Sequence, residues 1–218
     1  MALVGANDVI PNHVLSKEDQ DRLTPDEVIQ DLKEGNQIFA NDKLTIRNST
    51  QRVREAALGQ YPEAIVLSCI DSRVPVEDIF HKAIGDIFVA RIAGNVVDQD
   101  VLGSLEYGCK VSGAKLILVL GHEYCGAIKS SIEGAKLGHV TSILEKIDPA
   151  ITEAKHDFAG APSAKDNAFV TKVCEFNVLN SMKVIRENSP ILREMEQNNQ
   201  IKIVGAVYDL ETGLVAFL

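Results

Sequence analysis

The stretch IVLSCIDSRVP (residues 65–75) begins as a buried strand and ends among ionisable side chains. Its first residues form a continuous run of Ile, Val and Leu, which is typical of a strand buried on both faces. A thiol, a carboxylate and a guanidinium then follow at alternate positions, as Cys69, Asp71 and Arg73. Alternate side chains of an extended segment face the same way, so this spacing can deliver all three groups to one pocket.

The alternation of strands and helices around this stretch predicts the fold class. Apolar strands are expected within residues 63–71, 86–94, 114–122 and 201–210, with helical segments between them. Such an order favours an α/β fold with a mostly parallel central sheet and helices on both faces. A last strand within residues 213–218 follows so short a turn that it is expected to be an antiparallel C-terminal edge strand.

The chain is expected to form one domain behind a short arm. Residues 1–23 are polar and weakly patterned, which predicts an N-terminal arm, whereas no linker, repeat or low-complexity tract interrupts residues 24–218. Thr24 and Glu27 form a capping box that begins the first long helix. With 218 residues, 45% of them hydrophobic, the chain can bury a sizeable core.

Composition excludes several classes of partner. The chain has 22 basic and 31 acidic residues, a net charge of −9, which argues against a nucleic-acid partner. It has neither a basic amphipathic stretch nor an apolar run of about 18 residues, so no membrane partner is expected. The N-terminus lacks the pattern of a signal peptide, which predicts a cytoplasmic location; a periplasmic location would require that a leader had been removed.

Metal-ligand residues recur at the ends of two predicted strands. Cys69 follows the first strand, while His122 and Cys125 lie at the end of the third. Functional groups of open parallel sheets collect beyond the carboxyl ends of the strands. Two thiolates and an imidazole suit Zn²⁺ and leave a fourth position for water or another group. The other cysteines, Cys109 and Cys174, are interpreted as small core residues.

Two motifs carry a resemblance to a known family. CIDSRVP followed by GHEYCGAIK, with GDIFVARIAGNVV between them, resembles the paired C-x-D-x-R and H-x-x-C signature of the beta-class carbonic anhydrases. The resemblance extends over residues 24–218. It implies a carbonate dehydratase, a lyase that reversibly hydrates carbon dioxide to bicarbonate and a proton with one Zn²⁺ per chain. It also implies a homodimer or a dimer of dimers, because the family's pocket lies at a dimer interface.

The resemblance assigns roles to the motif residues. It makes Cys69, His122 and Cys125 the zinc ligands, and Asp71 and Arg73 the catalytic dyad. An ionised carboxylate only accepts hydrogen bonds, so Asp71 is expected to orient the hydroxide that zinc supplies near neutral pH. Arg73 would hold that carboxylate in place and keep it ionised. Without the flanking ligands, this pair would more simply be a structural salt bridge.

The family also lines its substrate pocket with a Gln, a Phe and a Tyr at characteristic offsets. Gln60, Phe88 and Tyr107 match the plant-like branch. Gln60 would donate a hydrogen bond to a substrate oxygen, and Phe88 would form an apolar wall for carbon dioxide. Gly126 would offer its amide to the anion. Gly121 and Gly126 are both expected to permit close backbone packing beside the ligands.

The branch predicts how the site is regulated. Some bacterial members close the site when the dyad Asp moves onto zinc and bicarbonate fills a pocket made by a Trp, an Arg and a Tyr. The corresponding residues here are Arg91 and Tyr208, but Val66 stands at the Trp position and the chain contains no Trp. Val lacks the indole donor, so an anion would lose a contact there. An open site, with Asp71 paired to Arg73, is therefore predicted.

Other functions were weighed against this interpretation. A catalytically silent zinc-binding scaffold would share the fold, although the intact Asp71 and Arg73 pair argues against it. A hydrolase of carbon disulfide or carbonyl sulfide would use the same ligands and differ in access to the pocket. A nucleotide-binding α/β domain is excluded because no G-x-G-x-x-G or P-loop follows a strand.

Overall fold

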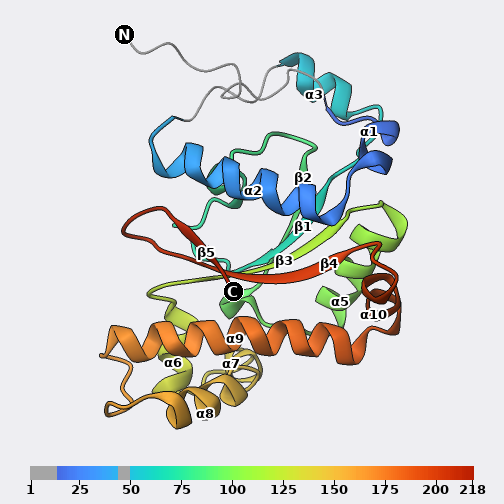
Figure 1. Ribbon diagram of the computed structural model, residues 1–218. Helices are drawn as coiled ribbons and strands as arrows, with labels where there is room; N and C mark the ends of the chain where they lie inside the picture. The colour runs from blue at the N-terminus through green and yellow to red at the C-terminus, as the bar shows by residue number, and fades with distance from the viewer. Residues whose placement is uncertain (1–13, 44–49) are drawn as a thin grey trace.

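The computed structural model describes residues 14–43 and 50–218. A five-stranded sheet with the order β2-β1-β3-β4-β5 lies at its centre (Figure 1). The first four strands run parallel, and β5 pairs antiparallel with β4 at one edge. This arrangement confirms the predicted α/β class and its antiparallel edge strand. The strands are β1 (Ala64–Ser68), β2 (Ile87–Arg91), β3 (Leu116–His122), β4 (Lys202–Tyr208) and β5 (Val215–Phe217).

Helices occupy the connections between the strands and the chain before β1. A 3₁₀ turn at Ala93–Asn95 follows β2, and the helix after it ends in a π-helical turn at Tyr107–Val111. The α-helices are α1 (Lys17–Arg22), α2 (Pro25–Ala40), α3 (Thr50–Ala56), α4 (Val76–Ile79), α5 (Gln99–Glu106), α6 (Gly126–Ile132), α7 (Val140–Leu144), α8 (Asp148–Asp157), α9 (Asn167–Asn188) and α10 (Pro190–Gln197).

The sheet is covered on both faces. Figure 1 shows α2 across one face and α9 across the other, with α6, α7 and α8 beyond α9. Side chains of β1 alternate between the two cores: Ile65 and Leu67 point into the cluster beside α9, and Ala64 and Val66 into the cluster beside α2. Because both faces are buried, these strands read as continuous apolar runs in the sequence.

Helix starts follow the local sequence signals. Thr24 and Glu27 form the predicted capping box of α2, with Pro25 in its first turn. Asp166, at the end of the loop that interrupts the helical region, accepts hydrogen bonds from the amides at the start of α9. Ser189 then caps α10 directly after α9 ends.

Helix α9 approaches β3 very closely at a glycine. A Cβ atom added at Gly121 would lie 2.7 Å from both Cys174 Sγ and Val178 Cγ2, so the close packing predicted there is confirmed. The same expectation for Gly126 is wrong, because no atom lies within 4 Å of the corresponding position. Gly126 begins α6 at the surface, where the helix turns away from the sheet.

Part of the predicted N-terminal arm packs on the domain. Helix α1 places Gln20 in the interior, where its Nε2 donates to the carbonyl oxygens of Pro62 at 2.7 Å and Ser112 at 2.8 Å. The remainder of the arm, residues 1–13, lies outside the described residues, and the division at residue 24 stays a prediction. Within the described ranges, no helix is both long and apolar enough to cross a membrane.

Candidate metal centre

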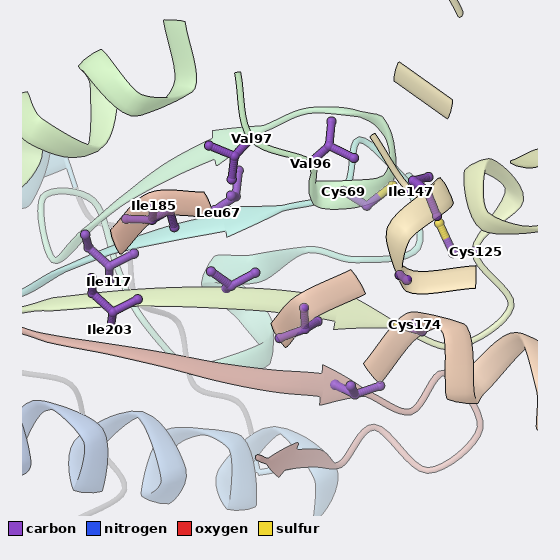
Figure 2. Packing of buried hydrophobic residues seen from close by; sticks show 14 of the residues in the cluster. Leu67, Cys69, Val96, Val97, Ile117, Cys125, Ile147, Cys174, Ile185 and Ile203 are labelled. Carbon is purple, nitrogen blue, oxygen red and sulfur yellow. The ribbon is translucent and has the colours of Figure 1, made fainter. Parts of the chain in front are cut away.

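The three predicted ligands meet beyond the carboxyl ends of two adjacent strands. Cys69 directly follows β1, His122 is the last residue of β3, and Cys125 immediately precedes α6. Their ligand atoms all lie within 4.8 Å of one another. Figure 2 shows Cys69 and Cys125 at one end of the core cluster beside Ile147. Parallel pairing of β1 with β3 therefore builds the centre from segments far apart in the sequence.

His122 presents one ring nitrogen to the centre. Its Nδ1 lies 2.7 Å from the carbonyl oxygen of Glu123, which assigns the proton to Nδ1 as the donor. Nε2 then carries a lone pair, and this buried atom has no hydrogen-bond partner among the described residues. A buried acceptor without a partner is costly, whereas a bound cation would satisfy it.

The two thiols form a coupled pair. The pKa of Cys69 is lowered, first because its sulfur accepts a hydrogen bond from the Cys125 thiol; the amide of Gly94, 3.3 Å from Cys69 Sγ, acts in the same direction. The pKa of Cys125 is raised by donating to Cys69 and by burial. The two sulfurs therefore interact directly, and a cation could bind both of them as thiolates. Two thiolates and an imidazole fit Zn²⁺.

Asp71 and Arg73 form a forked ion pair beside the ligands. Arg73 Nε donates to Asp71 Oδ1 at 3.0 Å and Arg73 Nη2 to Oδ2 at 2.8 Å, while the Arg73 amide adds a bond of 2.9 Å to Oδ1. The guanidinium lowers the pKa of Asp71 to about 2. Asp71 Oδ2 lies 3.8 Å from His122 Nε2. The carboxylate is therefore ionised at neutral pH and paired with Arg73, while the open site itself stays a prediction.

Arg91 holds the loop that carries this pair. Its Nε donates to the carbonyl oxygen of Cys69 at 2.9 Å, and its Nη2 to that of Asp71 at 2.6 Å. The sequence linked Arg91 to an anion pocket and missed this contact. The contact follows from the pairing of Ser68 with Arg91 in the sheet, which is visible only in the structure. Val66 and Tyr208, the other aligned positions, are buried in the cluster beside α2.

One chain does not bring all the predicted pocket residues together. Phe88 and Tyr107 line a groove of about 640 Å³ along the edge strand β2, which none of the three metal ligands lines. Gln60 is exposed in the loop before β1, at the amino end of that strand. Gly126 alone adjoins the centre, directly after Cys125.

The structure is that of an α/β protein whose Cys69, His122 and Cys125 side chains could hold a metal ion. Residues 64–215 match the sequence profile of the carbonic anhydrase family. Carbonic anhydrase 2 of Mycobacterium tuberculosis is 33% identical over 191 residues, covering 84% of this chain and 87% of that protein. The carbonic anhydrase of Mycolicibacterium smegmatis is 34% identical over 194 residues, covering 84% and 88%.

Solved structures agree with this match. A tetrameric beta-carbonic anhydrase from Sordaria macrospora superposes with a TM-score of 0.69 at 24% identity, covering 76% of this chain and 85% of that one. The Coccomyxa beta-carbonic anhydrase bound to acetazolamide gives a TM-score of 0.67 at 26% identity, covering 88% and 82%. The chain belongs to the carbonic anhydrase family, the carbonate dehydratases, and within it to the beta class.

The ion pair generates a prediction for the titration of Asp71. Replacing Arg73 by Leu should raise the pKa of Asp71 from about 2 towards its ordinary value of 3.8, because the forked donor is lost. In the intact protein the pair should stabilise the fold above that ordinary pKa, and this contribution should disappear as the pH falls towards 2. Carbon NMR of the Asp71 carboxyl measures the shift, with Arg193→Leu on α10 as the control.

Adding bicarbonate to the same NMR titration of Asp71 tests the open-site prediction. Added bicarbonate should leave the titration of Asp71 unchanged, because Arg91 already donates to two loop carbonyls and Val66 supplies no polar group. A bicarbonate-dependent loss of the Asp71 and Arg73 pairing would contradict the open-site prediction.

Proposed function

We propose that this chain is a zinc enzyme that reversibly hydrates carbon dioxide to bicarbonate and a proton. Cys69, His122 and Cys125 would hold one Zn²⁺ per chain. The observation that carries the proposal is their convergence within 4.8 Å, with His122 Nε2 buried and without a partner among the described side chains. Family membership supports the reaction, and the donor set supports the metal.

Zinc bound at this centre would supply hydroxide near neutral pH by lowering the pKa of water. Asp71 gives that nucleophile its direction. Its Oδ2, the oxygen on the His122 side of the dyad, is ionised and can only accept a hydrogen bond. The attacking oxygen must therefore point its proton at Asp71, which turns a lone pair towards the carbon of carbon dioxide.

Two arginines keep Asp71 in this role. Arg73 occupies both carboxylate oxygens from the solvent side, and its Nη2 also lies 3.4 Å from the carbonyl oxygen of Tyr124 in the ligand segment. Arg91 fixes the backbone on either side of residue 70 through its two carbonyl contacts. The carboxylate is held ionised and oriented before substrate arrives. Gly126, exposed with open space beside it, would offer its amide to the product anion.

The edge strand β2 supports a homodimer. Ile87, Phe88, Val89 and Ala90 are all only partly buried, and an apolar edge strand left open to water is an association site. In one chain, none of the three metal ligands lines the groove formed by Phe88 and Tyr107. We therefore infer that a second copy covers this edge, and that each subunit supplies Phe88, Tyr107 and Gln60 to the pocket of its partner.

Metal analysis tests the ligand assignment. The purified chain should carry about one zinc, and Cys69→Ala should lose both zinc and hydration activity, because three protein ligands leave little affinity once a thiolate is removed. Cys109→Ala is the matched control, since Cys109 is an equally buried thiol outside the cluster. Full zinc content in Cys69→Ala would refute the assignment.

Hydration kinetics test the role of Asp71. Asp71→Asn retains size but adds a donor, so the nucleophile is no longer oriented by an acceptor-only group. Turnover should fall by about a hundredfold or more while zinc stays bound. Wild-type turnover in zinc-loaded Asp71→Asn would exclude the proposed mechanism.

Mixed dimers test whether the pocket wall comes from the partner. A Cys69→Ala chain lacks the metal but keeps its wall, and a Phe88→Ala chain keeps the metal but lacks Phe88. When the two are co-expressed, the heterodimer should contain one complete site, so activity should exceed the average of the separate variants. Activity no higher than that average would place Phe88 in the pocket of its own chain, or outside the pocket.

A further inference from the structure

Helix α9 carries a row of polar side chains on its buried face. Cys174, Asn177 and Ser181 are spaced by three and four residues, so they share one side of the helix. All three are almost completely buried. Each donates to a backbone carbonyl in the segments around the metal centre: Cys174 Sγ to His122 at 3.3 Å, Asn177 Nδ2 to Gly94 at 2.8 Å and Ser181 Oγ to Asn95 at 3.1 Å. We call these three residues the α9 row.

The α9 row supplies donors that the adjoining turn requires. Gly94 has a φ of 69° and Asn95 a φ of 43°, so two successive residues of the 3₁₀ turn that follows β2 have positive φ angles. Their carbonyl groups enter the interior outside any strand ladder, where an unpaired carbonyl is costly. Asn177 and Ser181 satisfy them from the neighbouring helix. The Asn177 amide is buried, and its Nδ2 has this partner, whereas its Oδ1 has none among the described residues.

Residue 94 connects the α9 row to a metal ligand. The amide of Gly94 lies 3.3 Å from Cys69 Sγ, while the carbonyl of the same residue accepts the bond from Asn177. Glycine is the residue with the greatest freedom to leave a left-handed conformation. A Cβ here would lie 3.0 Å from Ile147 Cδ1 and 3.3 Å from Ala127 Cβ, and any side chain would be strained at this φ. The bond from Asn177 holds the Gly94 carbonyl in place.

We propose that Asn177 is a positioning residue of the metal centre, which aims the Gly94 amide at the Cys69 sulfur by holding the Gly94 carbonyl. The inference rests on the proposed zinc site. An N–H···S bond withdraws charge from a thiolate and fixes its direction, so it tunes both how firmly the sulfur binds a cation and how readily it gives up electron density. Asn177 would act on zinc through two hydrogen bonds without touching it.

Two variants on the same helix separate this role from general packing. Asn177→Leu has similar bulk but no donor, so the Gly94 carbonyl should no longer be held. The Gly94 amide should then no longer point at Cys69 Sγ. Ser181→Ala is the matched control, because it removes another buried donor to the same turn, one residue beyond the amide that contacts sulfur. Thermal unfolding of both variants should report the packing loss that they share.

Zinc affinity and a cobalt spectrum provide the readouts. In chelator competition, Asn177→Leu should raise the Kd for zinc by about tenfold or more, whereas Ser181→Ala should stay within about twofold of the intact protein. In the cobalt-substituted protein, the sulfur-to-metal charge-transfer band of Asn177→Leu should move to longer wavelength, because a thiolate without its N–H donor is more easily oxidised. Ser181→Ala should leave the band in place.

The results that would contradict the role of Asn177 differ from those that would contradict the proposed zinc site. Folded Asn177→Leu with the zinc affinity and cobalt band of the intact protein would overturn the proposal, as would equal shifts in Ser181→Ala. If Asn177→Leu does not fold, Asn177→Ser removes the same contact with a smaller side chain. Independently of any variant, the Gly94 amide proton of the intact protein should show scalar coupling to bound NMR-active cadmium. Absence of this coupling would overturn the proposal, because it would mean that the amide does not bond to the metal-bound sulfur. Failure of the intact protein to bind zinc would instead refute the proposed function.

Discussion

The parallel pairing of β1 with β3 is the constraint on which the rest of the structure depends. It sets Ser68 opposite Leu120, so the residue after β1 and the last residue of β3 emerge at the same edge of the sheet. Cys69 and His122 then need no long loops to meet, and Cys125 joins them from the start of α6. Because both strands are buried on both faces, a shift in register would place polar ligands in the core, which the apolar packing resists.

The charged groups around the centre are arranged from the interior to the surface, with the two cysteine sulfurs innermost and Arg73 outermost. Two thiolates and Asp71 would place three negative charges close together, an arrangement that burial alone would forbid. A bound cation would compensate the sulfurs at the interior side, while Arg73 pairs with the carboxylate at the surface side, where its own side chain remains 53% exposed. Asp71 stays ionised beside the buried sulfurs because the Arg73 side chain donates hydrogen bonds to both of its oxygens. In the proposed site, the buried sulfurs would bind the metal, and the carboxylate nearer the surface would orient the nucleophile.

The sequence revealed those parts of the site that lie in local patterns. Apolar runs located the strands, and the alternate spacing from Cys69 placed Asp71 and Arg73 together. Contacts between distant segments left no such pattern. Asn177 reads as an ordinary polar residue of a helix until the fold sets it against Gly94. The family resemblance grouped Phe88 with the ligands, although it could not show that one chain keeps them apart.

The close approach of α9 to β3 at Gly121 bears on the side from which molecules could reach the centre. A Cβ atom at Gly121 would collide with Cys174 Sγ and Val178 Cγ2, so no side chain fits between α9 and β3 directly beside His122. Arg73 and Gly126 are exposed, and apart from its own helix and chain neighbours nothing lies within 4 Å of the Cβ position at Gly126. For the proposed reaction, carbon dioxide would therefore approach, and bicarbonate leave, from this exposed side rather than past α9.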